Sequence, residues 1–281
     1  MPDFFSHMFL GQTVLPGMPS VMREAASLYT PLFNLGCQGP DLFFYYKLLN
    51  PGKRRGAVAF ANQCHNQNTR QFLGYGASYL LERREDTAFM AYWAGMLCHY
   101  ALDRCAHPFI DAHTSGFKAH KGLEMHLDAY MLHKKQGSAP YRVSIPPLIE
   151  SKGGLPESVT AFWVRLAGEV YGYELAPAVV TDSYKGMGII TGLYFSPRPR
   201  LRSFKIFVGR LFGLDISPYL ADFDKQNPLL PRSGYARFED CFAEARALAG
   251  PLGERYAALL KGACSLEEMV TGLPEINFSG K

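Results

Sequence analysis

The sequence has 281 residues, of which 48% are hydrophobic and 19% charged, and its formal net charge is +4. This composition supplies a large hydrophobic core and argues against a largely disordered chain. The charge is too small to indicate nucleic-acid binding by itself, and no apolar run reaches the roughly 18 residues of a membrane-spanning helix. Because the first residues show no basic segment followed by a long apolar run, we expect no signal peptide and a cytoplasmic protein.

The cysteines contain no CxxC pair, which excludes a zinc ribbon and a thioredoxin-type motif. In a reducing compartment they are expected to be small buried side chains rather than disulfides. They are Cys37, Cys64, Cys98, Cys105, Cys241 and Cys264.

In chain order, a helix is predicted after Ser20, a favourable N-cap, and should run to Pro31. The Gly/Pro turn GCQGPD (36–41) opens an aromatic stretch. Residues 55–83 have a helical pattern that is interrupted at the glycines of GYG. A helix from Thr87 should end at His107, because Pro108 disfavours helical geometry in the residue before it.

A second helix is predicted at Phe117–Lys135, and a Gly/Ser/Pro-rich connector follows it. Helices are expected at 157–175 and 177–195, and a final amphipathic pair at 235–250 and 253–263. With no period-two strand pattern, the predicted class is all-α. We expect one multi-helix domain over 1–281, with a metal-ligand half at 1–135, a C-terminal helical half at 155–281 and a metal cluster between core helices.

The segment 198–210 alternates basic side chains with phenylalanine, isoleucine and valine. One interpretation is a solvated basic face over a packed apolar face. The other is peripheral contact with an anionic membrane surface or a phosphate-rich substrate. Its basic residues are Arg198, Arg200, Arg202, Lys205 and Arg210.

Two rows of potential metal ligands stand out. The first is His99, Asp103 and His107, and the second has the same spacing of four. Four residues advance about 400° along an α-helix, so each row stacks on one face. Imidazole and carboxylate groups one turn apart suit zinc or manganese. The second row is His120, Glu124 and Asp128.

Seven of the eight histidines lie within residues 65–133. Three of them do not fit either row, so we expect them at the surface or behind the ligands: His113, His126 and His133. Asp128 lies one turn beyond Glu124 and is expected to orient a ligand histidine rather than bind metal.

The motifs GCQGPD (36–41), CHYALDRCAHPFI (98–110) and HKGLEMHLD (120–128) together resemble the bacterial zinc-dependent phospholipase C family, which is related to the single-strand-specific zinc nucleases. The resemblance covers roughly residues 5–135. It implies a mostly helical domain that holds two or three zinc ions.

The resemblance also implies a ligand set. His65, His99 and Asp103 would join Asp41 around one ion, and His7 would help Asp103 to hold a third. The second ion would be held by His107, His120 and Glu124. In secreted members an N-terminal tryptophan also binds the third ion. This sequence begins MPDFF, so two ions are expected and the third site lacks that contribution.

A cluster of this kind suits hydrolysis of a phospholipid or a small phosphodiester by metal-activated water. Asp41 is the candidate catalytic base, and a helix N-cap is the alternative role for it. Two other functions stay open. One is a nuclease-like phosphodiesterase, which the absence of an aromatic-basic repeat disfavours. The other is an inactive, metal-stabilised binding protein.

Overall fold

The computed structural model describes residues 4–48, 50–195, 201–211, 217, 223 and 230–281. Every regular element within these residues is helical, which confirms the all-α prediction. The longer helices are α1 (Phe4–Val14), α2 (Ser20–Leu28), α3 (Thr30–Gly36), α4 (Pro51–Asn66), α5 (Thr69–Glu82), α6 (Thr87–His113), α7 (Phe117–Gln136), α9 (Glu157–Tyr171), α10 (Pro177–Tyr194), α11 (Arg202–Leu211) and α12 (Arg232–Leu260). The shorter ones are η1 (Leu15–Gly17), η2 (Gly39–Tyr45), η3 (Pro140–Arg142), α8 (Pro146–Ile149) and α13 (Leu266–Thr271).

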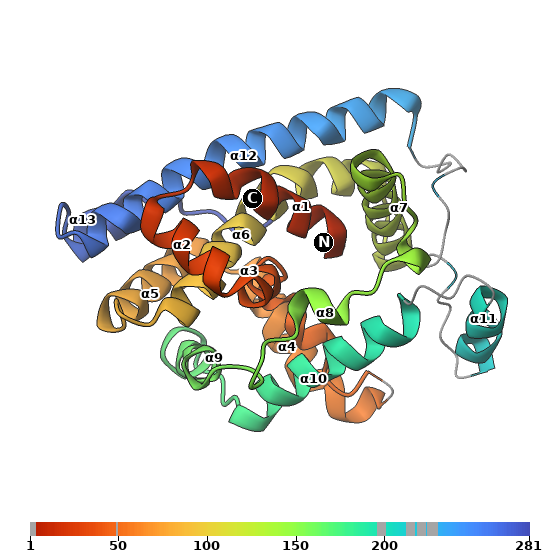
Figure 1. Ribbon diagram of the computed structural model, residues 1–281, viewed down its shortest axis with the longest axis horizontal. Helices are drawn as coiled ribbons and strands as arrows, with labels where there is room; N and C mark the ends of the chain where they lie inside the picture. Colours follow the sequence, from red (N-terminus) through yellow and green to blue (C-terminus); the bar gives the residue numbers. More distant parts are fainter. Residues whose placement is uncertain (1–3, 49, 196–200, 212–216, 218–222, 224–229) are drawn as a thin grey trace.

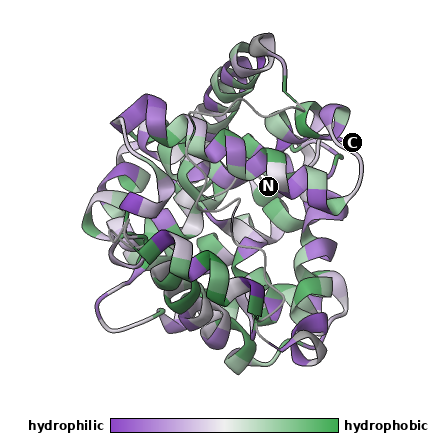
Figure 2. Cartoon of the chain, turned by 90° about the vertical axis from the view of Figure 1, so that its right-hand side faces the viewer, coloured by the Kyte–Doolittle hydropathy of each residue, from purple (hydrophilic) through white to green (hydrophobic). Residues whose placement is uncertain are grey.

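Helix α6 is the central element of the bundle. It packs against α12, α3 and α2, and it also contacts α1 and α7 (Figure 1). In the same view α12 crosses one side of the molecule, while α9 and α10 lie on the other. Hydrophilic and hydrophobic residues alternate along single helices, as expected where one face of each helix is buried (Figure 2). None of the described helices is long and apolar enough to cross a membrane.

Helix α1 is buried nearly all round, with nine of its eleven residues inside the core. Its first turn is held by a carboxylate from α7. The backbone N–H groups of Phe5 and Ser6 donate to Asp128 at 2.9 and 2.5 Å. Such N–H groups have no partner within a helix, and a negative charge at this end is favourable. Asp128 therefore fixes the first turn of the helix that carries His7, and its role in orienting a ligand histidine stays a prediction.

Two glycines let α3 and α6 approach closely. A Cβ on Gly36 would lie 2.0 Å from the carbonyl oxygen of Tyr92, and one on Gly95 would lie 2.1 Å from that of Phe33. No larger residue fits at either position without moving backbone. The contact brings the loop after α3 against the face of α6 that carries His99.

The predicted end of the central helix at His107 was wrong. Helix α6 continues through Pro108 to His113, and the side chains of Phe109 and Ile110 are buried. A proline inside a helix costs about 3 kcal/mol, whereas burying each large apolar side chain gains about 1.5–3 kcal/mol. Tertiary packing therefore outweighs the local preference.

Three other predicted boundaries were wrong. The Ser20 helix ends at Leu28, and Pro31 lies in the first turn of α3. Residues 55–83 break between α4 and α5 at Gln67 and Asn68, not at GYG. The GYG glycines lie inside α5, where Gly76 packs directly on the Trp93 ring. The predicted final pair is one helix, α12, with Pro251 inside it. The helices predicted at 117–135, 157–175 and 177–195 are present as α7, α9 and α10.

All six cysteines are free thiols; the prediction of small buried side chains is confirmed for four of them, whereas Cys105 and Cys264 are half-buried. Of the basic segment, residues 198–200 lie outside the described residues. The remainder forms α11, which stands beside the main body of the bundle (Figure 1).

Candidate metal centre

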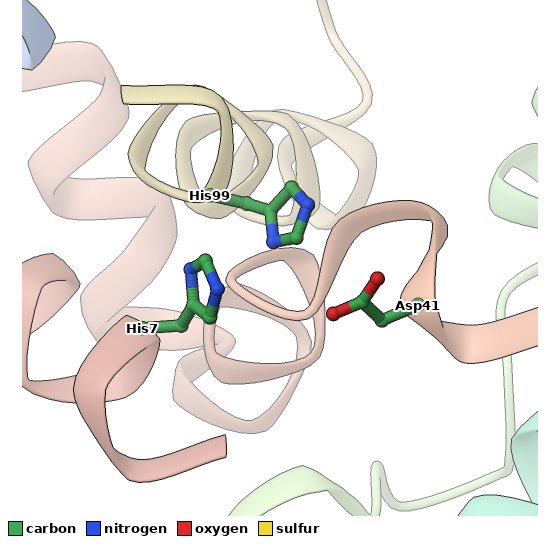
Figure 3. Close-up of side chains that lie close together, drawn as sticks. All are labelled: His7, Asp41 and His99. Atoms are coloured by element: carbon green, nitrogen blue, oxygen red, sulfur yellow. The ribbon is translucent and has the colours of Figure 1, made fainter. Parts of the chain in front are cut away.

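Histidine and carboxylate side chains from five elements meet between the helices. Figure 3 shows one group, in which His7 of α1, Asp41 of η2 and His99 of α6 point toward one another. Within each group, one ligand atom per residue lies within 4.8 Å of the others. The three groups are His7 with Asp41 and His99, His65 with His99 and Asp103, and His107 with His120 and Glu124.

Asp103 lies at the middle of the centre and is fully buried. Its Oδ1 lies 3.3 Å from His7 Nε2 and 3.6 Å from His107 Nε2. Its Oδ2 lies 3.3 Å from His99 Nε2 and 3.5 Å from His65 Nε2. One carboxylate thus faces four imidazole nitrogens, and a carboxylate that is buried in this way needs cations around it.

The second row of ligands comes from α7. His120 Nε2 lies 2.8 Å from Glu124 Oε1, one turn along the helix. The same oxygen lies 4.0 Å from His107 Nε2 on α6. His107 on α6 therefore faces α7, and the two rows meet at His107, His120 and Glu124.

The GCQGPD loop brings Asp41 to the centre. Gly39 has a φ of +54°, and a Cβ there would lie 2.2 Å from Cδ2 of the His99 ring. Only glycine suits both conditions. Asp41 follows in η2, with its Oδ1 3.2 Å from His65 Nε2. No side-chain hydrogen bond caps η2, so the alternative role of Asp41 as an N-cap has no support.

Backbone carbonyls fix two of the imidazole rings. The Nδ1–H of His65 donates to the carbonyl of Ala61 at 2.7 Å, and that of His99 donates to Cys37 at 3.2 Å. Since a carbonyl oxygen only accepts, the proton of each neutral ring lies on Nδ1. The Nε2 lone pairs are therefore directed at the centre, which is how ligand histidines are held.

The inward-facing atoms fit a metal ion better than they fit one another. Both oxygens of Asp103 are buried and form no hydrogen bond with any described residue. The same is true of the Nε2 atoms of His7, His65, His99 and His107. Buried polar atoms are nearly always hydrogen-bonded, and a group of orphaned nitrogens and oxygens in one place is what metal coordination explains.

The protonation states also suit metal binding. Burial lowers the pKa of His7, and it lowers that of His107 well below its usual value, so both rings are neutral at pH 7. Burial would raise the pKa of Asp103, but the facing imidazoles, His99 first, outweigh it and hold that pKa well below its usual range. Burial would in turn lower the pKa of His99, but Asp103 outweighs it and raises that pKa, so a proton competes with metal at this ring. Neutral imidazole and ionised carboxylate are the forms that bind metal.

A cavity of about 420 Å³ opens onto the centre. Asp41, His65, His107, His120 and Glu124 line it, whereas His7, His99 and Asp103 lie fully buried. A small molecule in the cavity would therefore meet the His107–His120–Glu124 group directly, and the two groups that share His99 through Asp41 and His65.

The protein-family comparison matches residues 6–173 to the family described as zinc dependent phospholipase C. That match spans more than half of the chain and includes all eight predicted ligands. The chain belongs to the zinc-dependent phospholipase C family. The search of curated proteins and that of solved structures find no match. The family description names zinc as the metal, and the three groups are candidates for holding it.

The other predicted residues of this zinc-dependent phospholipase C family member lie away from the centre. Nδ1–H of His113 donates to the carbonyl of Phe109 at 2.8 Å. His126 is buried, not at the surface, and its Nε2 lies 2.6 Å from the Tyr235 hydroxyl. His133 is exposed on α7.

Four residues near the centre were missed by sequence reasoning. Asp111 continues the first row at the same spacing of four, so the signal was present, but the predicted helix end at His107 concealed it. Arg54 belongs to no motif, and Ser279 and Lys281 lie far along the chain. All four line the cavity.

Burial of His120 predicts one part of the pH dependence of stability in the zinc-free protein; His99, whose pKa Asp103 raises, contributes in the opposite direction. Burial lowers the pKa of His120 to about 4, from 6.5 in an unfolded chain. Between these values the unfolded state binds the proton and the folded state does not, so this contribution to stability should fall as pH drops from about 6.5 toward 4. Melting temperatures of chelator-treated protein across this range test the prediction. His120→Gln should lose less stability over this range than the unmodified protein, and the same pH profile in both would contradict the prediction.

Proposed function

We propose that the protein is a zinc-dependent phosphodiesterase that cleaves a phospholipid-type phosphodiester. The observation that carries the proposal is the set of buried Asp103 oxygens and histidine Nε2 atoms that form no hydrogen bond with a described residue, together with the cavity of substrate size beside them. Membership of the zinc-dependent phospholipase C family supports the same reaction class.

The cavity also suits an anionic substrate. Arg54, Lys121 and Lys281 line it together with the ligands. The Nη2 of Arg54 donates to the carbonyl of Phe44 at 3.2 Å, which holds the guanidinium at the cavity wall. Its Nε is buried without a hydrogen bond to a described residue. Guanidinium and ammonium groups bind phosphate oxygens through charge-assisted hydrogen bonds.

In the proposed reaction, water attacks phosphorus and the bond from phosphorus to the leaving oxygen breaks. Zinc supplies the Lewis acidity that offsets charge on the phosphoryl oxygens and makes water nucleophilic at neutral pH. The Asp41 carboxylate lies at the boundary between ligand groups and cavity, where it accepts the proton of the attacking water. Arg54 and Lys121 orient the phosphate, and the leaving oxygen takes a proton from solvent in the cavity.

The test is hydrolysis of phosphodiesters that carry choline, inositol or nucleotide groups by protein reconstituted with zinc. We expect hydrolysis of the lipid-type diesters, lost on chelation and restored by zinc, and a zinc content of about two ions per chain given the ligand count. A matching phosphomonoester is the control for general phosphatase activity. Hydrolysis of the nucleotide diester alone would favour the nuclease-like alternative, and zinc binding without turnover would favour the binding protein.

We further propose that α11 contacts an anionic lipid surface. Four exposed apolar side chains, three on α11 and Leu201 directly before it, form one stripe at spacings of three and four: Leu201 is exposed by 40%, Phe204 by 62%, Phe207 by 58% and Leu211 by 68%. Lys205 and Arg210 flank this stripe on either side. Apolar side chains that enter the lipid beside cations that meet its head groups are typical of interfacial helices.

This contact predicts binding that weakens as salt rises. Each basic residue near an anionic leaflet contributes about 1 kcal/mol, and each buried phenylalanine contributes about 1.5–3 kcal/mol. Phe204→Glu combined with Phe207→Glu should therefore lower co-sedimentation with anionic vesicles by more than about tenfold. Both side chains are exposed, so the fold should be unaffected, which circular dichroism would check. Equally weak binding of the unmodified protein to anionic and neutral vesicles would contradict the proposal.

A further inference from the structure

Residues 276–281 return from the far end of the chain to the metal centre. The backbone N–H of Thr69 donates to the carbonyl of Ile276 at 2.8 Å, and that of Phe278 donates to the carbonyl of His65 at 3.2 Å. The Phe278 ring is fully buried, with its centroid 5.5 Å from that of His65 and 5.9 Å from that of His99. This segment therefore packs directly behind two predicted ligands, although it lies outside the family match at 6–173.

The end of the segment is a turn closed by its own hydrogen bonds. Asn277 donates its backbone N–H to the carbonyl of Lys281 at 3.0 Å, and its side-chain oxygen accepts from the backbone N–H of Lys281 at 2.9 Å. Gly280 has a φ of +73°, which glycine adopts without strain. The turn thereby fixes where Ser279 and Lys281 stand.

This turn contacts His107 directly and His120 through Asp111. The Ser279 hydroxyl lies 3.2 Å from Nδ1 of His107, whose Nε2 faces the centre. Lys281 Nζ lies 2.6 Å from one oxygen of Asp111, and the other oxygen lies 3.2 Å from Nδ1 of His120. His65 and His99 are instead anchored by backbone carbonyls within the family match.

We propose that residues 276–281 form a strap that completes the zinc site of the His107–His120–Glu124 group, with Ser279 positioning His107 and Lys281 positioning His120 through Asp111. The inference rests on the proposed zinc binding but not on the identity of the substrate. A hydrogen-bond partner on the outer nitrogen of a ligand histidine sets the orientation and basicity of the ring, and removing it typically weakens metal binding 10–100-fold. The His65–His99–Asp103 group, whose two histidines have backbone anchors, keeps its affinity.

The test is zinc affinity by competition with a chromophoric chelator, together with the visible spectrum of the cobalt-substituted protein. Ser279→Ala should weaken one ion of the cluster about 10–100-fold, leave the other unchanged and alter the cobalt spectrum. Ser279→Thr keeps the hydroxyl and should restore binding. Lys281→Gln should weaken the same ion to a smaller extent, because Asp111 remains beside His120. Ser27→Ala and Lys261→Gln, at exposed positions on α2 and directly after α12, are the matched controls.

The outcomes separate this inference from the proposed function. Ser279→Ala and Lys281→Gln proteins that are folded and bind every ion within about twofold of the controls would overturn the strap, whatever the activity. Weaker binding of one ion in a protein that hydrolyses no phosphodiester would support the strap and reject the proposed function. An unmodified protein that binds no zinc would overturn both.

Discussion

Asp103→Asn should abolish phosphodiesterase activity and remove most of the bound zinc while leaving the helical fold in place. Asparagine has the same shape as aspartate, but it loses the charge and one of the two oxygens that face four imidazole nitrogens at 3.3–3.6 Å. A loss of about 4 kcal/mol of transition-state stabilisation corresponds to roughly a thousandfold in rate, and loss of a shared ligand should cost at least that much.

Zinc content, rate with a chromogenic diester, and circular dichroism are the three measurements for Asp103→Asn. Asp240→Asn on the exposed face of α12 is the matched control and should behave as the unmodified protein. Full activity, or an unchanged zinc content, in Asp103→Asn would remove this carboxylate from the centre. A loss of helical signal would show instead that the carboxylate is needed for folding. Single histidine variants such as His7→Gln, which each remove one candidate ligand, would then test the centre.

The two rows of candidate ligands could be predicted because helical spacing is a short-range property, whereas His7, Asp41 and His65 came only from the family resemblance. His99 and Asp103 share a face of α6 whatever surrounds them, and His120 and Glu124 do so on α7. How the two rows meet depends on contacts that no local pattern encodes. The close approach at Gly36 and Gly95 is one such contact, and Asp128 holding the first turn of α1 is another.

One wrong boundary concealed a neighbour of the site. Because a proline disfavours helical geometry in the residue before it, the helix was predicted to end at His107, and Asp111 was then assigned to a loop. In the structure α6 continues, and Asp111 is the next member of the row that begins at His99. Each step of four turns the side chain about 40° further round the helix, so Asp111 reaches the cavity rim rather than the core. There it lies beside His120.

The strap could not be predicted from the sequence for a different reason. Its residues have no periodic pattern and no ligand spacing, and a serine or a lysine near the end of a sequence carries no chemical signal of its own. Ser279 reaches His107 only because Phe278 is buried against α5 and the ligand rings. Long-range packing of a single side chain decides the position of its neighbours, and sequence patterns do not report it.

Gly39→Ala should disrupt the centre without touching a ligand. The φ of +54° costs a non-glycine residue about 1–2 kcal/mol, and the new Cβ would lie 2.2 Å from the His99 ring. Since real Cβ atoms do not approach so closely, the ring or the loop that carries Asp41 must move, and forced overpacking costs about 1–3 kcal/mol more. We therefore expect about 2–5 kcal/mol lower stability, and zinc affinity on the order of 10–100-fold weaker because ligands are displaced.

Chemical denaturation and zinc competition on the same preparation measure the two effects of Gly39→Ala. Gly168→Ala is the matched control, since Gly168 lies on the exposed face of α9 and a Cβ added there would meet nothing within 4 Å. Alanine is the better helix former there, so this control should be unchanged or slightly more stable. Lower stability with unchanged zinc affinity would mean that the loop yields while His99 and Asp41 stay in place. Wild-type values for both quantities would show that the tight contact between this loop and the His99 ring does not position the ligands.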